Sequence, residues 1–492
     1  MQPVCGVCVE QNELRDLQNT EAWYRPATRL DVLWGMSEQK RNGFGADLVL
    51  HSERVLTPAG LQAATVRVEE GRIASIEPGP EPAKDAEALG SALLMGGLVD
   101  SHVHVNEPGR TEWEGWETAT RAAARGGVGV LADMPLNSSP VTTTRAALAE
   151  KIDSMDGKLW VDCALWGGVV PGNAGELPGM VHDGVSGFKA FLCHSGIDDF
   201  PASERSDLER AMPILRDLDV PLLFHAELEA LQPPDVSMHA LNEYIRWLHA
   251  RPREWEDRAI EMVIDLVERT GCRAHIVHLS SATALPMLRA AKRRGLPITV
   301  ETCPHYLCLV AEDIPPGATE FKCAPPIRGS ENREALWNGL AEGIIDQVVT
   351  DHSPCIPSLK LPETGDFENA WGGIASLQLG LASVWSEAGR RGFNVRDIAR
   401  WMSAAPAKLL GMEHHMGGIA VGKRADLVAW RPDALFAVRA DSLLQRHPIT
   451  PYLGTELYGE VDHTWVRGHC ALHHGVPSAE PCGSILKRKK HE

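Results

Sequence analysis

The sequence contains no long hydrophobic run and no excess of positive charge. No apolar stretch approaches the roughly 18 residues that a membrane-spanning helix requires. The 48 lysines and arginines against 66 aspartates and glutamates give a formal net charge of −18, which disfavours binding to nucleic acid or another polyanion. We therefore expect neither a membrane nor a nucleic acid as a partner, and a small molecule is the expected substrate.

The cysteines lack the regular spacing of a disulfide framework. There are 11 of them, and an odd, scattered set is typical of reduced thiols in an intracellular protein. Cys5 and Cys8 have the spacing of half a zinc knuckle or of a redox pair, but no second pair follows, which favours an incidental pair. Because the first 30 residues also lack the basic and apolar regions of a secretory signal, we expect an intracellular protein, cytoplasmic, peroxisomal or mitochondrial.

Changes in the spacing of apolar residues divide the chain of 492 residues into five parts. Residues 1–44 show no sustained periodicity and are expected to be an N-terminal extension, partly ordered at best. Short strands separated by turn residues occupy 45–95 and again 413–475, on either side of a long middle part, 96–412. Residues 476–492 are expected to be a flexible tail, whose basic end is interpreted as solvated rather than as a nuclear signal. The simplest packing joins the two β segments into one small β-sandwich.

The middle part alternates strands with helices. Eight apolar segments of strand character occur in it, and most are followed by a segment of helical periodicity. These segments are residues 98–104, 128–134, 159–169, 185–191, 220–225, 274–278, 298–302 and 347–351. An open doubly wound sheet is the alternative, but no G-x-G-x-x-G follows the first strand. The predicted fold is therefore α/β, a (β/α)8 TIM barrel with a small β-sandwich domain built from the N- and C-terminal segments.

Two histidines lie near the end of the first of these strands, in the stretch Gly-Leu-Val-Asp-Ser-His-Val-His-Val-Asn-Glu-Pro-Gly-Arg at 97–110. His102 and His104 are two residues apart, so both imidazoles point to the same face of the strand. Pro108 and Gly109 stop the strand, which leaves the pair at its carboxyl end, where the active sites of parallel barrels lie. Alone, such a pair is more often incidental than functional.

Four other strands end in residues that can bind a metal ion, namely Lys189, His225, His278 and Asp351. An unpaired polar side chain in a core costs several kcal/mol, so an ordinary barrel would place apolar groups there. Imidazole and carboxylate are the ligands that suit zinc and similar divalent ions. Each residue alone has an ordinary structural explanation, and His275 is a rival to His278. A metal site is absent only if every one of these separate explanations is true at once, so the set of residues favours a metal site.

Several motifs resemble those of the cyclic amidohydrolases, the family of dihydroorotases, hydantoinases or dihydropyrimidinases, and allantoinases. The resemblance covers residues 46–470. The motifs are Gly-Leu-Val-Asp-x-His-x-His at 97–104, Gly-Phe-Lys at 187–189, Glu-Thr-Cys-Pro-His-Tyr-Leu at 301–307, Lys-Cys-Ala-Pro-Pro-Ile-Arg at 322–328, Asp-His-Ser-Pro at 351–354 and Gly-Lys-Arg-Ala-Asp-Leu-Val at 422–428.

The resemblance implies two divalent metal ions that share a carboxylated lysine, here Lys189. Zinc is the expected metal. One ion would be bound by His102, His104 and Asp351, and the other by His225 and His278. It also implies that a hydroxide formed between the ions attacks the cyclic amide, while Asp351 accepts a proton and returns it to the leaving nitrogen. Because a carbamate forms only from a neutral amine, burial beside cations must lower the pKa of Lys189.

The residues after the two histidines bear on the substrate. Dihydroorotases carry an arginine for the substrate carboxylate where this chain has Asn106, and an uncharged amide suits a neutral substrate. The segments 110–118 and 134–140 resemble the allantoinase branch of the family, which implies hydrolysis of (S)-allantoin to allantoate. His194 stands where hydantoinases place a tyrosine that hydrogen-bonds the developing oxyanion, so the oxyanion donor is left open.

The candidate substrate contacts are Asn106, Asn137, His194 and Cys303. One alternative function is that of a hydantoinase or dihydropyrimidinase. A second, of a different class, is a non-catalytic dihydropyrimidinase-like scaffold protein, which shares the fold but has lost metal ligands. All six ligand positions are filled here, which favours an enzyme. The resemblance further implies a homo-oligomer, in this family often a tetramer.

Overall fold

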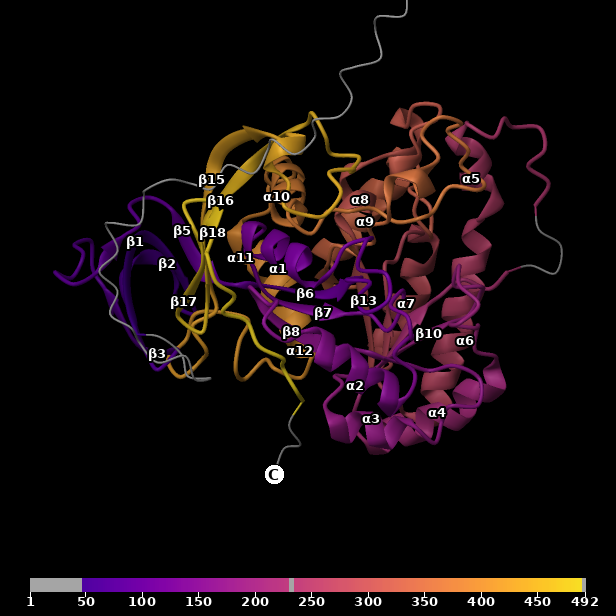
Figure 1. Cartoon of the computed structure of the whole chain (residues 1–492), viewed down its shortest axis with the longest axis horizontal. Helices are drawn as coiled ribbons and strands as arrows, with labels where there is room; N and C mark the ends of the chain where they lie inside the picture. The colour runs from indigo at the N-terminus through magenta and orange to yellow at the C-terminus, as the bar shows by residue number, and fades with distance from the viewer. Residues whose placement is uncertain (1–46, 230–233, 489–492) are drawn as a thin grey trace, which may run out of the picture. The chain divides into compact units, whose positions relative to one another are not determined.

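The computed structural model describes residues 47–229 and 234–488 (Figure 1). The expected N-terminal extension, with Cys5 and Cys8, lies outside the described residues. Within them, no helix combines the length and the apolar character needed to cross a membrane.

Eight parallel strands form a barrel in the described chain, each at a place where the sequence predicts one. They are β6 (Leu98–Val103), β7 (Val128–Asp133), β8 (Asp162–Leu165) with its continuation β9 (Gly167–Gly168), β10 (Phe188–Phe191), β11 (Leu222–His225), β12 (Ala274–Ile276), β13 (Ile298–Thr302) and β14 (Gln347–Val348). Strands β6 to β8 are hydrogen-bonded in order, as are β9 to β14. A parallel bridge between Val103 and His352 links the two ends of the ring. The TIM-barrel prediction is confirmed.

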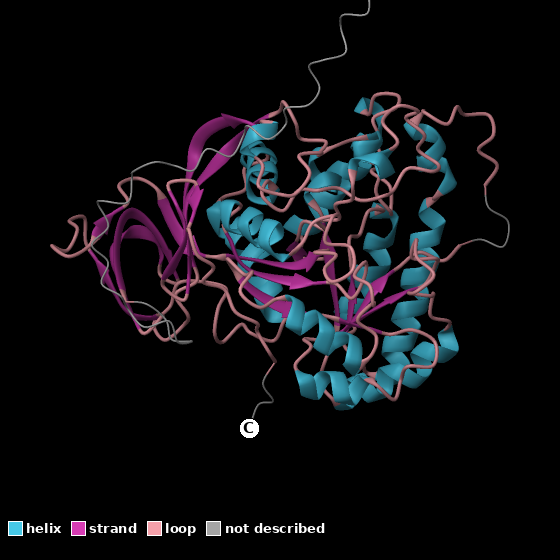
Figure 2. Cartoon of the chain, in the orientation of Figure 1, coloured by secondary structure: helices cyan, strands magenta, loops and turns pink. Residues whose placement is uncertain are grey.

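Helices cover the outside of the barrel strands (Figure 2). The α-helices of the described chain are α1 (Trp116–Arg125), α2 (Arg145–Ser154), α3 (Leu177–Asp183), α4 (Arg205–Asp217), α5 (Tyr244–Ala250), α6 (Arg253–Thr270), α7 (Leu285–Arg293), α8 (Pro304–Cys308), α9 (Ser330–Ala341), α10 (Gly380–Arg390), α11 (Val395–Ala399) and α12 (Ala405–Leu409). The sequence of α4 shows why: Leu208, Ala211, Met212 and Leu215 recur at helical spacing and are all buried. The strands are buried on both faces, and every residue of β6, β7, β10 and β11 is buried, as expected where helices cover a parallel sheet.

The strands before and after the barrel join in one nine-stranded sheet. Its strands are β1 (Leu48–Thr57), β2 (Gly60–Glu69), β3 (Arg72–Pro78), β4 (Glu87–Ala88), β5 (Leu93–Gly96), β15 (Leu427–Ala437), β16 (Glu456–Val466), β17 (His469–His473) and β18 (Val476–Pro477). Strand β5 pairs with β15, with Gly96 opposite Leu427. The sheet curls (Figure 1), and Val66 of β2 and Trp465 of β16 share one buried core. The expected joining of the two β segments is therefore confirmed.

Residues 482–488 lie against the barrel. The backbone N–H of Gly483 donates to the carbonyl of Leu159 at 2.8 Å, and that of Leu486 donates to Cys163 of β8 at 2.8 Å. Ile485 forms a parallel bridge with Cys163. This differs from the flexible tail expected over 476–492, because a short segment that extends a sheet by backbone hydrogen bonds carries no mark in its composition.

Asp162, at the start of β8, connects the barrel to both of the elements just described. It is fully buried, and its carboxylate binds Arg424, Arg467 and the backbone N–H of Ser484. Replacing Asp162 with alanine leaves two largely buried guanidinium groups without this carboxylate, which is expected to cost about 3–5 kcal/mol. The free energy of unfolding, measured with a chemical denaturant, checks this.

The matched control is Asp441→Ala, which removes the carboxylate of an exposed pair with Arg439. Loss of such a surface pair is expected to change the free energy of unfolding by less than about 1 kcal/mol. Equal losses in the two variants would contradict a structural role for Asp162.

Candidate metal centre

The structure brings the six predicted ligands together at the carboxyl end of the barrel strands. None has more than 8% of its surface exposed. They come from five strand ends, and they are His102 and His104 at the end of β6, Lys189 in β10, His225 at the end of β11, His278 after β12 and Asp351 after β14.

The first group contains His102, His104 and Asp351. The Nε2 atoms of the two histidines lie 3.1 and 3.4 Å from Oδ1 of Asp351. Nδ1 of His102 faces Oε1 of Glu301 at 2.5 Å, and Nδ1 of His104 faces the carbonyl of Leu136 at 2.7 Å. Because those two oxygens only accept hydrogen bonds, each Nδ1 carries the proton and each Nε2 turns a lone pair toward Asp351.

Three lone-pair atoms that face one another need a cation between them. Burial and the nearby Lys189 ammonium lower the pKa of His102 to about 4, so a proton on this ring does not supply that charge at neutral pH. A divalent ion bound to all three atoms does, and the partners of the Nδ1 atoms hold the rings in the orientation that this requires. The donor set therefore fits a metal ion.

The second group contains His225 and His278. Nδ1 of His225 lies 3.0 Å from Nε2 of His278. Nε2 of His225 donates to Glu227 at 2.7 Å, which leaves the Nδ1 lone pair facing His278. Arg251 anchors Glu227 through two hydrogen bonds, at 2.6 and 3.0 Å. Two imidazole nitrogens thus face each other at a second candidate metal position. The ion pair between Glu227 and Arg251 orients His225, and it was not identified from the sequence.

Lys189 lies between the two groups. Its Nζ is 3.0 Å from Nε2 of His102, and on the other side it lies over the ring of Phe191, which stacks on His225. Burial lowers the pKa of Lys189 to about 8, although Asp351 and Glu301 oppose the shift. The neutral amine, which this shift makes more abundant near neutral pH, is the form that can react with carbon dioxide.

Three predicted site residues have a left-handed backbone conformation. Asn106, His278 and Asp351 have φ angles of 68°, 39° and 46°. Residues other than glycine rarely adopt this region, at a cost of about 1–3 kcal/mol each, and such residues gather at functional sites. All three lie two or three residues after the end of a barrel strand, namely β6, β12 and β14.

Glu301 orients His102 of the first group through a hydrogen bond. It accepts hydrogen bonds from His102, from Nε2 of His275 at 2.8 Å and from Gln347 at 3.0 Å. Burial alone would raise the pKa of Glu301, but the two histidines outweigh it and hold the pKa well below its usual range. The other ring nitrogen of His275 contacts Thr299. Both ring nitrogens of this rival to His278 are therefore occupied by Glu301 and Thr299, neither of which is one of the six predicted ligands.

The candidate substrate contacts differ in their surroundings. Asn106 is buried, and its Nδ2 donates to the carbonyl of Pro354 at 3.2 Å, whereas its Oδ1 forms no hydrogen bond within the described residues. Asn137 is buried, and Cys303 lies beside Asp351. His194 is exposed and contacts Asp198 at 3.4 Å, so the structure does not place it with the six ligands.

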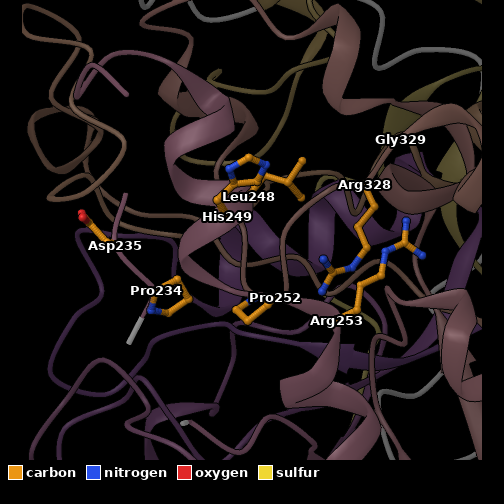
Figure 3. A pocket seen from close by; sticks show the side chains of 8 residues that line it. All are labelled: Pro234, Asp235, Leu248, His249, Pro252, Arg253, Arg328 and Gly329. Atoms are coloured by element: carbon orange, nitrogen blue, oxygen red, sulfur yellow. The ribbon is translucent and has the colours of Figure 1, made fainter. Parts of the chain in front are cut away.

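A separate cavity of about 470 Å³ lies beside α5 and α6. Figure 3 shows the side chains of Arg253 and Arg328 next to each other on one side of it. Arg328 pairs with Glu256 at 2.6 Å, and Glu256 accepts from the backbone N–H groups of Ser280 and Ser281. None of the six ligands lines this cavity, but the arginine of the 322–328 motif helps to hold the loop that follows His278.

A parallel barrel with imidazole and carboxylate ligands at its carboxyl rim defines a metal-dependent hydrolase. The sequence matches the model of the Amidohydrolase family over residues 93–470, and the chain belongs to this family. Allantoinase of Streptomyces avermitilis is 46% identical over 447 residues, which cover 90% of this chain and 99% of that protein. Allantoinase of Arabidopsis thaliana is 42% identical over 456 residues, 89% of this chain and 90% of that protein.

Solved structures agree on the fold. L-hydantoinase (dihydropyrimidinase) from Arthrobacter aurescens superposes with a TM-score of 0.84 at 26% identity, covering 90% of this chain and all of that chain. The chain is thus similar in sequence to allantoinases and in structure to hydantoinases.

Replacing Glu301 with glutamine is expected to weaken metal binding by about 10- to 100-fold, the usual effect of losing a carboxylate that orients a ligating histidine. The amide keeps the shape of Glu301 but loses its charge and one of its two acceptor oxygens, so His102 or His275 loses its partner. Metal retained against increasing chelator measures this. Exposed Glu342→Gln is the control, and identical retention in the two variants would contradict the role given to Glu301.

Proposed function

We propose that the chain hydrolyses the hydantoin ring of (S)-allantoin to give allantoate. The cluster of six predicted ligands is the observation that supports a hydrolytic activity. The similarity to relatives named allantoinase over 90% of the chain supports the choice of substrate.

In this proposal the two ligand groups would hold two divalent ions, with zinc as the expected metal, and a carboxylated Lys189 would supply a ligand to both. The ions would be held by His102, His104 and Asp351 and by His225 and His278. When bound, such ions lower the pKa of a water molecule and polarise the carbonyl that it attacks. The converging lone pairs of the two groups support this assignment.

Asp351 is the proposed proton carrier. Its contacts with His102, His104 and Ser353 all involve Oδ1, which leaves Oδ2 as the oxygen that takes a proton. As the water oxygen bonds to the amide carbon, Asp351 accepts a proton from the water. It returns this proton to the ring nitrogen as the carbon–nitrogen bond breaks, so the ring opens with no other proton donor.

Asn106 is the proposed contact that favours a neutral substrate. Its Nδ2 is held by Pro354, next to the loop that carries Asp351, and its buried Oδ1 is an acceptor for an N–H of the ureide. An arginine at this position would instead select a carboxylate. Asn137 and the backbone at Cys303 are further proposed contacts. His194 is the weakest of the four because it lies on an exposed loop.

A substrate panel tests the proposal. Metal-loaded protein is assayed with allantoin, dihydroorotate, hydantoin and dihydrouracil, and we expect allantoin to be hydrolysed fastest. Fastest turnover of dihydroorotate would contradict the role given to Asn106, and fastest turnover of hydantoin or dihydrouracil would favour a hydantoinase or dihydropyrimidinase. Less than about one equivalent of divalent metal per chain, with no ring opening, would favour the scaffold protein.

The location and the assembly are further parts of the proposal. Every cysteine in the described part of the chain is a free thiol, which supports an intracellular location. A relative from Aquarana catesbeiana is named as a mitochondrial allantoinase. The family resemblance supports a homo-oligomer, with a tetramer as the specific expectation, and analytical ultracentrifugation tests it.

A further inference from the structure

A second group of histidines lies in the curled sheet, where the end of β17 pairs with β16. His463, His473 and His474 each present a ring nitrogen, and these nitrogens lie within 4.8 Å of one another. The ring centroids are 4.3 to 4.8 Å apart. None of the three belongs to the six-ligand cluster or to a motif by which the chain resembles its family.

The pairing of the strands brings these histidines together. His463 of β16 lies directly opposite His473 of β17 in the antiparallel ladder, so their side chains share one face of the sheet. His474 follows in the two-residue turn between β17 and β18, with φ angles of 46° for His474 and 75° for Gly475. Such turns favour asparagine, aspartate or glycine at the position that His474 occupies, so turn formation alone does not account for a histidine there.

A β-bulge adds a carboxylate to the group. Trp430 pairs with Val461 and Ala429 with His463, so Asp462 is the extra residue of β16. Bulges redirect side chains, and here the Asp462 carboxylate lies 3.3 Å from Nδ1 of His474 and 3.7 Å from Nδ1 of His463. It is also bound by Arg431 at 2.9 Å.

His463 is the residue that points to a ligand. It is only 2% exposed, and neither of its ring nitrogens has a hydrogen-bond partner within the described residues. A buried polar atom left in this state costs about 1–3 kcal/mol. The nearest charged group on its other side is the carboxylate of Glu87, 3.6 Å from Nε2. The ring is held in place by stacking on Trp465, with centroids 5.2 Å apart and planes at 6°.

We propose that His463, His473 and His474 bind one divalent transition-metal ion, with Asp462 as the fourth ligand. Three imidazoles and a carboxylate suit Zn²⁺, and also Cu²⁺ or Ni²⁺, rather than Mg²⁺ or Ca²⁺, which take oxygen ligands. Tetrahedral zinc places its ligand atoms about 3.3 Å apart. The ring nitrogens would close to this spacing from within 4.8 Å, and His474, which is 64% exposed, leaves an entry path for the ion.

This site is separate from the barrel chemistry, because its ligands come from the curled sheet alone. The ion would connect β16 to β17 and to the turn that follows β17. Its expected effect is on the binding of metal and on the stability of this part of the sheet, and not on ring opening.

Zinc binding to the full-length, metal-loaded protein tests the proposal. Wild type, His474→Asn and His414→Asn are dialysed against the same free Zn²⁺ concentrations, and zinc per chain is measured by mass spectrometry. Asparagine tolerates the left-handed turn position, so His474→Asn keeps the fold, and His414 is an exposed histidine outside the group. We expect wild type and His414→Asn to bind one more zinc per chain than His474→Asn. Equal zinc contents in all three would overturn the proposal.

Quenching of tryptophan fluorescence by Cu²⁺ gives a second, site-specific readout. A paramagnetic ion on His463 lies next to the stacked Trp465, so quenching should saturate at one added equivalent in wild type and be lost in His474→Asn. Allantoin hydrolysis should be the same in both, which separates this site from the proposed activity. Identical quenching curves for the two proteins would contradict the assignment.

Discussion

A chain with Lys189 replaced by alanine is expected to hydrolyse allantoin at least about 10³-fold more slowly, the order of loss seen when a group that acts as part of a catalytic unit is removed. Lys189 is the side chain that lies between the two ligand groups, with Nζ 3.0 Å from His102. Its loss removes the carboxylate that both groups are proposed to share. Initial rates of ring opening and bound metal per chain are the measurements.

Rescue distinguishes a carbamate from an ordinary buried lysine. A short carboxylic acid fits the space that the lysine side chain leaves and supplies the missing carboxylate, so added acetate or propionate should restore part of the activity of Lys189→Ala. Lys408→Ala, at an exposed position, is the control and should behave as wild type. Near-normal activity of Lys189→Ala without added acid would refute the carbamate.

Replacing Asp351 with asparagine is expected to lower kcat by about 10²- to 10⁴-fold, the range for the loss of a positioned general base. The amide has nearly the same size, so packing is preserved, but it cannot accept a proton. It also removes the anion that His102 and His104 face at 3.1 and 3.4 Å. Steady-state kinetics with metal-saturated protein measure the effect.

Ser353→Ala is the matched control, because it removes only one hydrogen bond to the same carboxylate, at 3.1 Å. This change is expected to lower kcat less than about tenfold. An Asp351→Asn variant with an altered KM and a normal kcat would show that Asp351 binds the substrate and does not move the proton.

The barrel could be predicted from the sequence because its signals are local. Apolar strand segments alternate with helical periodicity, and each of the eight predicted strands is present. The joining of the two β segments followed from their positions on either side of the barrel, whereas the pairing of β5 with β15 is known only from the structure. The placement of residues 482–488 could not be predicted, because backbone hydrogen bonds to Cys163 leave no pattern in the side chains.

The ligand cluster could be predicted because ligands at the ends of parallel strands converge whatever their order in the sequence. The residues that orient the ligands depend on which strands are neighbours and in which register. Glu301 of β13 contacts His275 of the neighbouring β12 and also His102 of β6, which does not pair with β13, and no spacing along the chain contains that information. For the same reason the antiparallel partners His463 and His473 were not recognised as a pair.

The pairing of β5 with β15 also bears on synthesis. Gly96 leaves the ribosome long before Leu427, its partner across the sheet, and at ordinary elongation rates the interval is on the order of half a minute. During that time one edge of β5 has no strand beside it and is a template for pairing with another nascent chain. The small domain therefore reaches its final form only after the barrel has been translated.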